Sequence, residues 1–208
     1  LRKEIFLKAL LVLLFVTATS QAQTWQKTNE GIKTTINKTD VEIQFYTAST
    51  VRIIKSPAGT SFNKKSLSVI ATPKQAKLTI KEQAAVLTVK SEKLTVKCNL
   101  TSGAISFYTN AGTVLLNEKE NSASFKAFND AGSNTYNIEQ AYLLDKEEAI
   151  YGLGQQQAGK MVQRNLTMNM VQNNTSDYVP FFQSAKGYGL FWDNYSPTTF
   201  TDNLESTS

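Results

Sequence analysis

The chain has 208 residues, of which 41% are hydrophobic and 19% charged, and its formal net charge at pH 7 is +5. It contains no histidine, which excludes Ser-His-Asp and Cys-His catalysis and zinc sites that use histidine. Cys98 is the only cysteine, so no intrachain disulfide can form. The lysines are scattered and alternate along predicted strands, a pattern that argues against nucleic-acid binding.

The first 22 residues predict a secretion signal. A basic start is followed by an apolar run over residues 9–16 and by small residues, and Ser20-Gln21-Ala22 suits cleavage before Gln23. The apolar run is far shorter than the roughly 20 residues that span a bilayer, so no membrane span is expected after cleavage. We therefore expect an exported protein, periplasmic or extracellular.

After residue 22, apolar and polar residues alternate with a period of two, which predicts short strands. The predicted strands cover residues 41–45, 51–54, 78–80, 86–89, 94–98, 104–108 and 114–116. Pro57 is expected to end the second of them, and Asn110-Ala111-Gly112 is expected to turn between the last two. Short strands spaced about 8 to 12 residues apart predict an all-β fold, an antiparallel β-sandwich.

The second half of the chain is less regular. Residues 121–134 are rich in Ser, Asn, Asp and Gly and predict a loop or a poorly ordered crossing between sheets, whereas residues 136–144 and 198–201 predict strands. From residue 149 onward the chain is rich in Gly and aromatic residues, without the composition of a linker. We therefore expect one domain over residues 23–208, and no terminating feature marks its end, as in a longer protein cut short.

Two chemical patterns have simpler explanations. Residues 154–160 have the spacing of a phosphate-binding loop, but Met161 stands where that loop needs Ser or Thr, so a Gly-rich turn is expected. Sugar hydrolysis requires two carboxylates across the scissile bond. The acidic run at residues 145–148 predicts a solvated turn, and Asp193 predicts a turn after a strand. We expect no catalytic pair, no metal site and no cofactor in this chain.

Three motifs follow one another near the end: Ile150-Tyr151-Gly152-Leu153-Gly154-Gln155, then residues 179–184 (VPFFQS), then residues 187–194 (GYGLFWDN). Together they resemble the end of the N-terminal domain of glycoside hydrolase family 31. The resemblance extends over nearly all of residues 23–208, with its diagnostic part in the last third. It implies a galactose-mutarotase-like β-supersandwich that stops before the catalytic (β/α)8 barrel.

The same resemblance implies the function of the parent protein, a retaining α-xylosidase or α-glucosidase. In that family two Asp residues of the downstream barrel serve as nucleophile and acid/base, so this chain alone is expected to be inactive. The implied partners are an α-linked oligosaccharide substrate and the barrel of the same polypeptide. Gln155 stands where many α-glucosidases of the family have Glu, and this resembles the bacterial α-xylosidase branch.

The candidate substrate-binding residues are Gln172, Asn173 and Asn174, amides at the place where family members direct a loop over the sugar site. Amide side chains both donate and accept hydrogen bonds, as sugar hydroxyls require. An ordinary polar loop is the alternative interpretation. The aromatic residues Phe181, Phe182 and Tyr188 are expected in the core rather than as sugar platforms.

A second hypothesis for the whole chain belongs to another class of protein. The chain could be a free-standing exported carbohydrate-binding β-sandwich without catalysis. The continuation of the reading frame into a barrel distinguishes the enzyme domain from this binding module.

Overall fold

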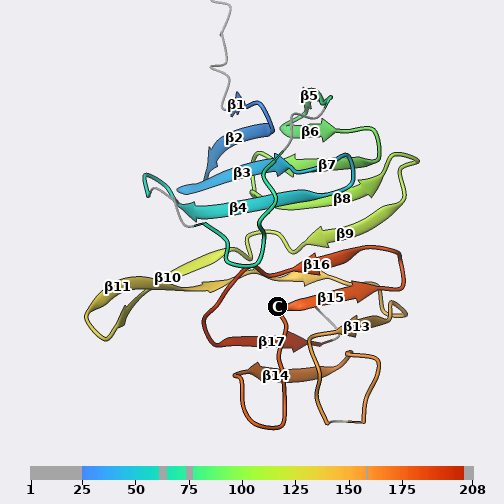
Figure 1. Ribbon diagram of the computed structural model, residues 1–208. Coiled ribbons are helices and arrows are strands. Elements are labelled where there is room, and N and C mark those ends of the chain that lie inside the picture. The colour runs from blue at the N-terminus through green and yellow to red at the C-terminus, as the bar shows by residue number, and fades with distance from the viewer. Residues whose placement is uncertain (1–24, 61–64, 74–76, 158, 204–208) are drawn as a thin grey trace, which may run out of the picture.

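The computed structural model describes residues 25–60, 65–73, 77–157 and 159–203, and in these ranges it contains strands and no helix. All strand pairs are antiparallel (Figure 1). The predicted secretion signal lies outside the described residues. Within them, no helix is long and apolar enough to cross a membrane. The prediction of an all-β protein is confirmed.

The first layer is a four-stranded sheet with the order β1-β2-β3-β4. Its strands are β1 (Trp25–Lys27), β2 (Gly31–Ile36), β3 (Thr39–Phe45) and β4 (Val51–Pro57). Asn37 and Lys38 join β2 to β3 with φ of 49° and 61°, the two positive values of a type I′ turn. Such a turn matches the right-handed twist of the strands on either side.

The second layer is a six-stranded sheet with the order β12-β9-β8-β7-β6-β5. Its strands are β5 (Thr79–Gln83), β6 (Val86–Lys90), β7 (Leu94–Asn99), β8 (Ile105–Thr109), β9 (Val114–Glu118) and β12 (Tyr142–Leu143). The predicted turn at 110–112 does connect β8 to β9, with Gly112 at φ 91°.

The main hydrophobic core lies between these two sheets (Figure 1). Alternate residues of β3 point inward, so that Val41, Ile43 and Phe45 are buried while Glu42 and Gln44 between them are half-buried. Both layers contribute to the buried cluster: Ile32, Ile36, Val41, Ile43, Phe45, Leu87, Val89, Leu94, Val96, Cys98 and Ile105. Each fully buried aliphatic side chain contributes about 1.5–3 kcal/mol, so this cluster drives folding of the sandwich.

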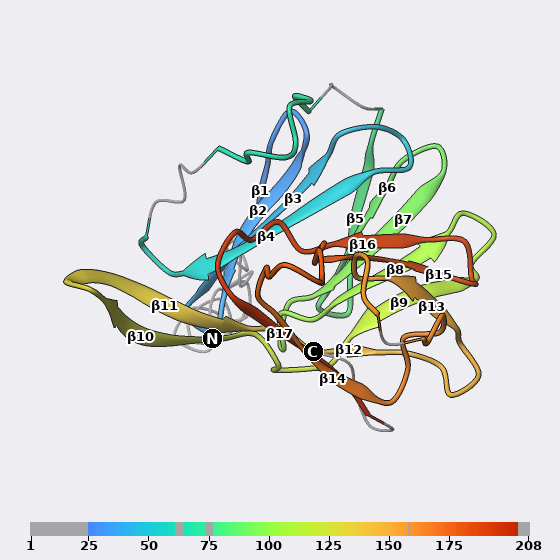
Figure 2. The ribbon, with the colours of Figure 1, turned by 60° about the horizontal axis from the view of Figure 1, so that its bottom comes forward.

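The prediction of a loop over residues 121–134 is wrong. A hairpin occupies this region, made of β10 (Ser124–Asp130) and β11 (Ser133–Glu139), and it projects from the body at the left of Figure 2. Ala131 and Gly132, at φ 48° and 95°, form its turn. All residues of β11 and most of β10 are exposed, so no buried face produced the apolar alternation that identifies a strand. The strand expected at 136–144 is divided between β11 and β12.

The remaining strands form a second, smaller core (Figures 1 and 2). A three-stranded sheet has the order β13-β15-β16, and β14 pairs with β17. These strands are β13 (Ile150–Gly152), β14 (Leu166–Met170), β15 (Phe181–Ser184), β16 (Gly189–Phe191) and β17 (Thr198–Asp202), the last confirming the predicted strand at 198–201. Between them lie the buried side chains of Ile150, Leu153, Met170, Phe182 and Phe200.

Asp193 links the two parts of the molecule. One carboxylate oxygen pairs with the Arg52 guanidinium of β4 at 3.0 Å. The other accepts hydrogen bonds from the hydroxyls of Ser66, at 3.0 Å, and Tyr195, at 2.8 Å. Asp193 follows β16, as the turn prediction placed it, but its carboxylate also binds a strand 141 positions earlier in the chain.

Candidate functional site

The loop between β14 and β15 contains the three candidate amides. The Gln172 side chain joins the segment that leaves β14 to the segment that enters β15. The Gln172 amide nitrogen donates to the carbonyl of Tyr178 at 2.8 Å, and its amide oxygen accepts from the backbone N–H of Tyr178 at 2.8 Å. These two bonds imitate the exchange between paired residues of an antiparallel ladder. Gln172 therefore closes the loop across its width.

Asn173 shapes the tip of the same loop. Its side-chain oxygen accepts hydrogen bonds from the backbone N–H groups of Thr175, at 2.8 Å, and Ser176, at 2.9 Å, and from the Thr175 hydroxyl at 2.9 Å. An Asn that bonds its own backbone two residues on is a common turn former. Asn174 is exposed, and within the described part of the chain its side chain makes no recorded hydrogen bond. The structure thus brings the three candidates together in one loop, with Asn174 at its solvent-facing tip.

The Tyr-Gly-Leu-Gly motif anchors the base of this loop. Gln155 and Asp177 exchange two backbone hydrogen bonds, of 2.7 and 3.0 Å. A Cβ on Gly154 would stand 2.0 Å from the Asp177 carbonyl oxygen, and one on Gly152 would stand 2.7 Å from the Phe181 carbonyl oxygen. Glycine at both positions lets the two segments approach, while Leu153 between them is buried in the second core. The phosphate-loop spacing that starts at Gly154 precedes no helix, as expected.

The predicted solvated turn is present at residues 145–147, which are exposed, but Glu148 at its end is buried, against that prediction. Its side chain is 1% exposed and accepts hydrogen bonds from the hydroxyls of Ser184, at 2.5 Å, and Tyr188, at 2.6 Å. The Lys186 ammonium lies 3.3 Å from it. Burial alone would raise the pKa of Glu148, but these hydrogen bonds, that of the Asp145 N–H and the Lys186 charge hold it below its usual value. Nothing in the sequence distinguished Glu148 from its exposed acidic neighbours, because its partners Ser184 and Tyr188 lie about 40 residues further along the chain.

Two of the acids considered for sugar hydrolysis in the sequence, Glu148 and Asp193, are bound within the fold. The Glu148 carboxylate is fully occupied by its hydrogen-bond partners, and Asp145 shares Lys186 with it while being 71% exposed. Asp193 is held by Arg52 and two hydroxyls. In the described ranges no group of three His, Cys, Asp or Glu side chains could hold a metal ion. These carboxylates fix the structure of the domain.

The aromatic residues near the loop divide into two groups. Phe182 is 3% exposed, and Tyr188 packs against it with ring centroids 6.3 Å apart, as predicted for core residues. Phe181 is 41% exposed, so the expectation that it is a core residue is wrong. Successive residues of a strand point to opposite faces of the sheet, which places Phe181 outside when Phe182 is inside.

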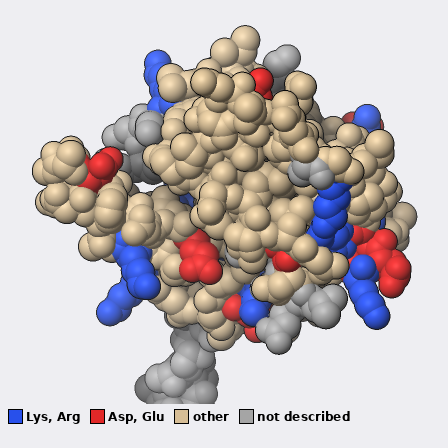
Figure 3. Space-filling view, turned by 90° about the horizontal axis from the view of Figure 1, so that it is seen from below, with Lys and Arg blue, Asp and Glu red and all other residues tan. Residues whose placement is uncertain are grey.

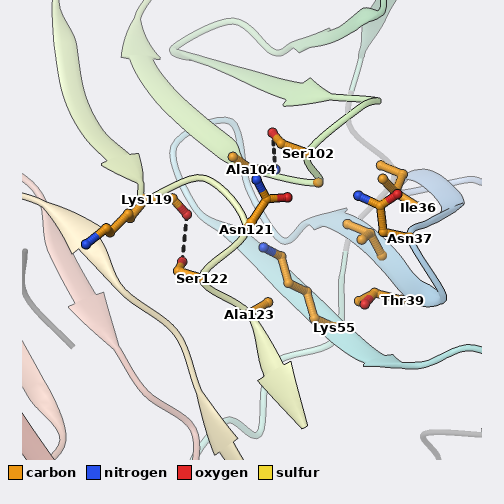
Figure 4. A pocket seen from close by; sticks show the side chains of 12 residues that line it. Ile36, Asn37, Thr39, Lys55, Ser102, Ala104, Lys119, Asn121, Ser122 and Ala123 are labelled. Atoms are coloured by element: carbon orange, nitrogen blue, oxygen red, sulfur yellow. Dashed lines mark hydrogen bonds between the residues drawn. The ribbon is translucent and has the colours of Figure 1, made fainter.

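A pocket of about 120 Å³ lies elsewhere, at one end of the first core (Figure 4). It is lined by residues of β2 to β4, the β7–β8 turn and the segment after β9, none of them from the candidate loop. Lys55 reaches it from β4, but its ammonium is bound to Glu118 at 2.6 Å and to Gln140 at 3.1 Å. The Lys55 ammonium is therefore already paired within the fold.

Residues 40–200 match a family model described as the glycosyl hydrolase 31 N-terminal galactose mutarotase-like domain. An alpha-xylosidase of Saccharolobus solfataricus is 33% identical over 107 residues, which cover 47% of this chain and 14% of that protein. The crystal structure of a GH31 alpha-xylosidase from Xanthomonas citri superposes with a TM-score of 0.81 at 29% identity, covering 85% of this chain and 20% of that one. A GH31 alpha-xylosidase from a soil metagenome shares the fold, with a TM-score of 0.77 at 21% identity, over 89% of this chain and 30% of that one.

This chain spans a small part of each relative's length, between 14% and 30% in these three. The residues matched by the family model include the three motifs near the end of the chain, the second core and most of the first core. The match of the family model over most of the sequence, together with the antiparallel sandwich found in the structure, assigns the family. The chain belongs to glycoside hydrolase family 31, of which it contains the N-terminal galactose mutarotase-like domain.

Proposed function

We propose that this chain is the N-terminal domain of an exported, retaining glycoside hydrolase that acts as an α-xylosidase or α-glucosidase. The observation that carries the proposal is the match to the family domain together with its similarity, at 33% and 29% identity, to two alpha-xylosidases. In this proposal the domain supports a downstream catalytic barrel and contributes a loop to the site that binds α-linked oligosaccharides. Export rests on the signal-like residues 1–22, and an amino terminus at Gln23 in the secreted protein would establish it.

The geometry of the β14–β15 loop gives its amides different roles in this proposal. The side chains of Gln172 and Asn173 are engaged inside the loop. Asn174 is exposed at the tip, and its amide offers both donors and an acceptor for a sugar hydroxyl. We assign sugar contact to Asn174, with Gln172 and Asn173 holding the tip in place.

Kinetics of the full-length enzyme test the role of the loop. Asn174→Ala should lower kcat/KM about three- to tenfold, because a lost hydrogen bond to a neutral hydroxyl costs about 0.5–1.5 kcal/mol. Asn173→Ala should lower kcat/KM as well, through a displaced tip. Asn137→Ala, an exposed amide on the distant β11, is the matched control and should leave kcat/KM unchanged.

The measurement uses one aryl α-xyloside and one aryl α-glucoside for each variant, with melting temperatures to verify folding. If Asn174→Ala, Asn137→Ala and wild type have equal kcat/KM on both substrates, the loop does not contact the sugar and only connects β14 to β15. The same substrates should give no product with residues 23–208 alone, since catalysis is assigned to the barrel. Turnover by this domain that disappears in Glu148→Gln or Asp193→Asn would refute that assignment.

A further inference from the structure

The pocket at one end of the first core combines an apolar floor with a polar rim (Figure 4). Its volume is about 120 Å³, and Ile36 and Val41, which are buried in the first core, form its floor. Asn37 and Asn121 also line it and are exposed, so the pocket opens to solvent between them. A cavity of about 150 Å³ holds a benzene ring, so a pocket of this size that is open on one side admits a single six-membered ring.

Lys55 brings an ammonium group to the pocket with one N–H to spare. Its side chain extends from β4 toward the middle of the lining residues (Figure 4) and is only 12% exposed. The ammonium has three donors, of which Glu118 accepts one at 2.6 Å and Gln140 accepts another at 3.1 Å. No third acceptor is recorded for it among the described residues. A buried donor without an acceptor is costly, so the remaining N–H requires a water molecule or a ligand in the pocket.

Three further hydrogen-bonding groups of the lining are not used by the fold. Asn37 donates its amide nitrogen to the Thr101 carbonyl at 2.8 Å, which leaves its amide oxygen available. The side chains of Thr39 and Asn121 make no recorded hydrogen bond within the described ranges. Asn121 has φ 53° like a turn residue, but it does not bond its own backbone as Asn173 does. The pocket therefore offers both donors and acceptors to a ligand.

The charges at the pocket are balanced. Glu118 neutralises Lys55, and its carboxylate also accepts a hydrogen bond from the Ile105 N–H at 2.8 Å. Lys119 is one of the lining residues, but its side chain points away from the others in Figure 4. A neutral ligand with several hydroxyl groups suits this lining better than an ion, because no charge in the pocket lacks its counter-charge.

Another uncharged surface of the molecule has a different chemistry. Figure 3 views the end of the molecule built from β13 to β17, and its broad middle is free of Lys, Arg, Asp and Glu. Tyr151, Phe181 and Phe191 of that sheet are exposed aromatic residues. None of the 12 described residues that line the pocket is aromatic. The pocket is thus built for a ligand that is recognised mainly by hydrogen bonds.

We propose that this pocket binds one neutral monosaccharide in its pyranose form. The ring carbons lie over Ile36 and Val41, and the hydroxyl groups accept from the spare Lys55 N–H and exchange hydrogen bonds with Thr39 and Asn121. The lining alone supports this inference. Only the choice of xylose and glucose as probes rests on the proposed function, in which these are the sugars released.

An NMR titration of the nitrogen-15-labelled 208-residue chain with xylose or glucose tests the proposal. We expect saturable shifts of the Gly103, Asn121 and Ser122 amides. The Kd should be about 1–10 mM, because a monosaccharide has few atoms and part of it stays in water. Shifts that still grow linearly at about 100 mM overturn the proposal, and so does saturable binding that leaves these amides unchanged.

Substitutions then identify the side chains that bind the sugar. Thr39→Val and Asn121→Ala each remove one hydrogen-bonding group and should raise the Kd about three- to tenfold. Lys55 is kept, because its removal would leave the buried Glu118 without a counter-charge. Asn137→Ala, an exposed amide on the distant β11, is the matched control and should leave the Kd unchanged. An equal Kd for wild type and both pocket variants overturns the proposal.

Two related solutes distinguish other ligands. If glucuronate, with a carboxylate in place of the CH₂OH group, binds about tenfold more tightly than glucose, the pocket is an anion site and the proposal is overturned. Glycerol that binds as tightly as xylose overturns it too, because any small polyol then suffices. Weaker binding of both solutes supports a pyranose site. The titration uses no catalytic activity, so its failure leaves the proposed function standing, and failure of the proposed function leaves the titration valid.

Discussion

Glu148 is the residue whose role differs most from its sequence context. It stands in the acidic run 145–148, yet its carboxylate is buried beside Ser184, Tyr188 and Lys186. A buried carboxylate is tolerated only when hydrogen bonds and an opposite charge compensate for its lost hydration. The hydrogen bonds from β15 and from the β15–β16 turn tie the start of β13 to its neighbours.

The lowered pKa of Glu148 makes the stability of the domain depend on pH in a defined direction. The unfolded chain takes up the proton first, so this contribution is present above the ordinary Glu pKa of about 4.3 and is lost as pH falls through the lower folded value. Glu148→Gln should lower the free energy of unfolding by about 2 kcal/mol at pH 7. That difference from wild type should shrink by pH 3.

Urea unfolding at pH 7, 5 and 3 measures this effect. Glu147→Gln is the matched control, since Glu147 is exposed and its change should stay within about 0.5 kcal/mol at each pH. If Glu148→Gln lowers the free energy of unfolding by the same amount at all three pH values, the hydrogen bonds of Glu148 stabilise the domain and its charge does not.

Gly154 provides a second test at this scale. Its φ is 93°, and an added Cβ would stand 2.0 Å from the Asp177 carbonyl oxygen, whereas Gly187, at φ 85°, has nothing within 4 Å. Alanine should cost about 1 kcal/mol at either position for the left-handed backbone. Gly154→Ala should lower the free energy of unfolding by about 1–3 kcal/mol more than Gly187→Ala, because the base of the loop must move to make room for the Cβ. Denaturation midpoints of the two variants measure the difference, and equal midpoints would contradict the clash.

At the scale of single residues, sequence reasoning succeeded where a position has one dominant property. Phe182 is apolar, and it is buried as expected. It failed where the partner comes from a distant strand. Nothing near Glu148 in the sequence indicates Tyr188, and Phe181 looks as apolar as Phe182 although the pleat turns it outward.

Among the elements, the hairpin β10–β11 stands apart from both cores. Phe125 and Tyr136 pack edge to face across it, with ring centroids 6.4 Å apart, but most of its residues are exposed. A two-stranded hairpin without further cover is marginally stable in water. This element owes its persistence to its attachment at both ends and to its own cross-strand contacts.

Local opening should therefore differ between elements. We expect the amides of β10 and β11 to exchange with deuterium at least about 100-fold faster than those of β7, which lies in the middle of the six-stranded sheet. The pair β14–β17 is the matched control, because it also has two strands but buries Met170 and Phe200. Exchange in the hairpin as slow as in β14–β17 would show that it is covered in solution.

The elements that could be predicted from the sequence are those that bury part of their surface. Strands β3, β6, β7 and β9 each bury several residues, and apolar alternation in the sequence predicted all four. The hairpin β10–β11 buries neither face, so its Ser, Asn and Lys residues looked like a loop. The turn between β5 and β6 could not be predicted from the sequence either. Ala84 and Ala85 both adopt positive φ there, a conformation that Asn or Gly usually indicates.

For the whole molecule, Cys98 is a natural reporter of unfolding. Its side chain is buried between the two main layers, and burial raises the pKa of its thiol to about 12. Because the thiolate is the reactive form, the native protein should resist a thiol reagent at pH 8. Labelling of Cys98 should require global unfolding, so its rate should rise steeply with urea. The free energy of opening obtained from labelling should equal that from hydrogen exchange of the β7 amides. Fast labelling in native buffer would contradict the buried position.

The division of the described residues into two cores was not visible in the sequence. The first core shows itself by repeated apolar alternation, whereas the second gathers short strands from 150 to 202 whose spacing is irregular. The end of the chain was nevertheless identified at the level of its family, because glycines forced by close backbone contact, at positions 152 and 154, leave a recognisable motif.

The backbone bridge between Gln155 and Asp177 has a consequence for sequence variation in the loop. The bridge uses main-chain atoms, so the base of the β14–β15 loop holds its place whichever side chains occupy positions 173–176. Mutations in the tip therefore leave this bridge in place, even where they remove the hydrogen bonds that Asn173 makes inside the tip. If the loop has the proposed role in sugar binding, random variation confined to these four positions would change the sugar preference while the base of the loop stays in place.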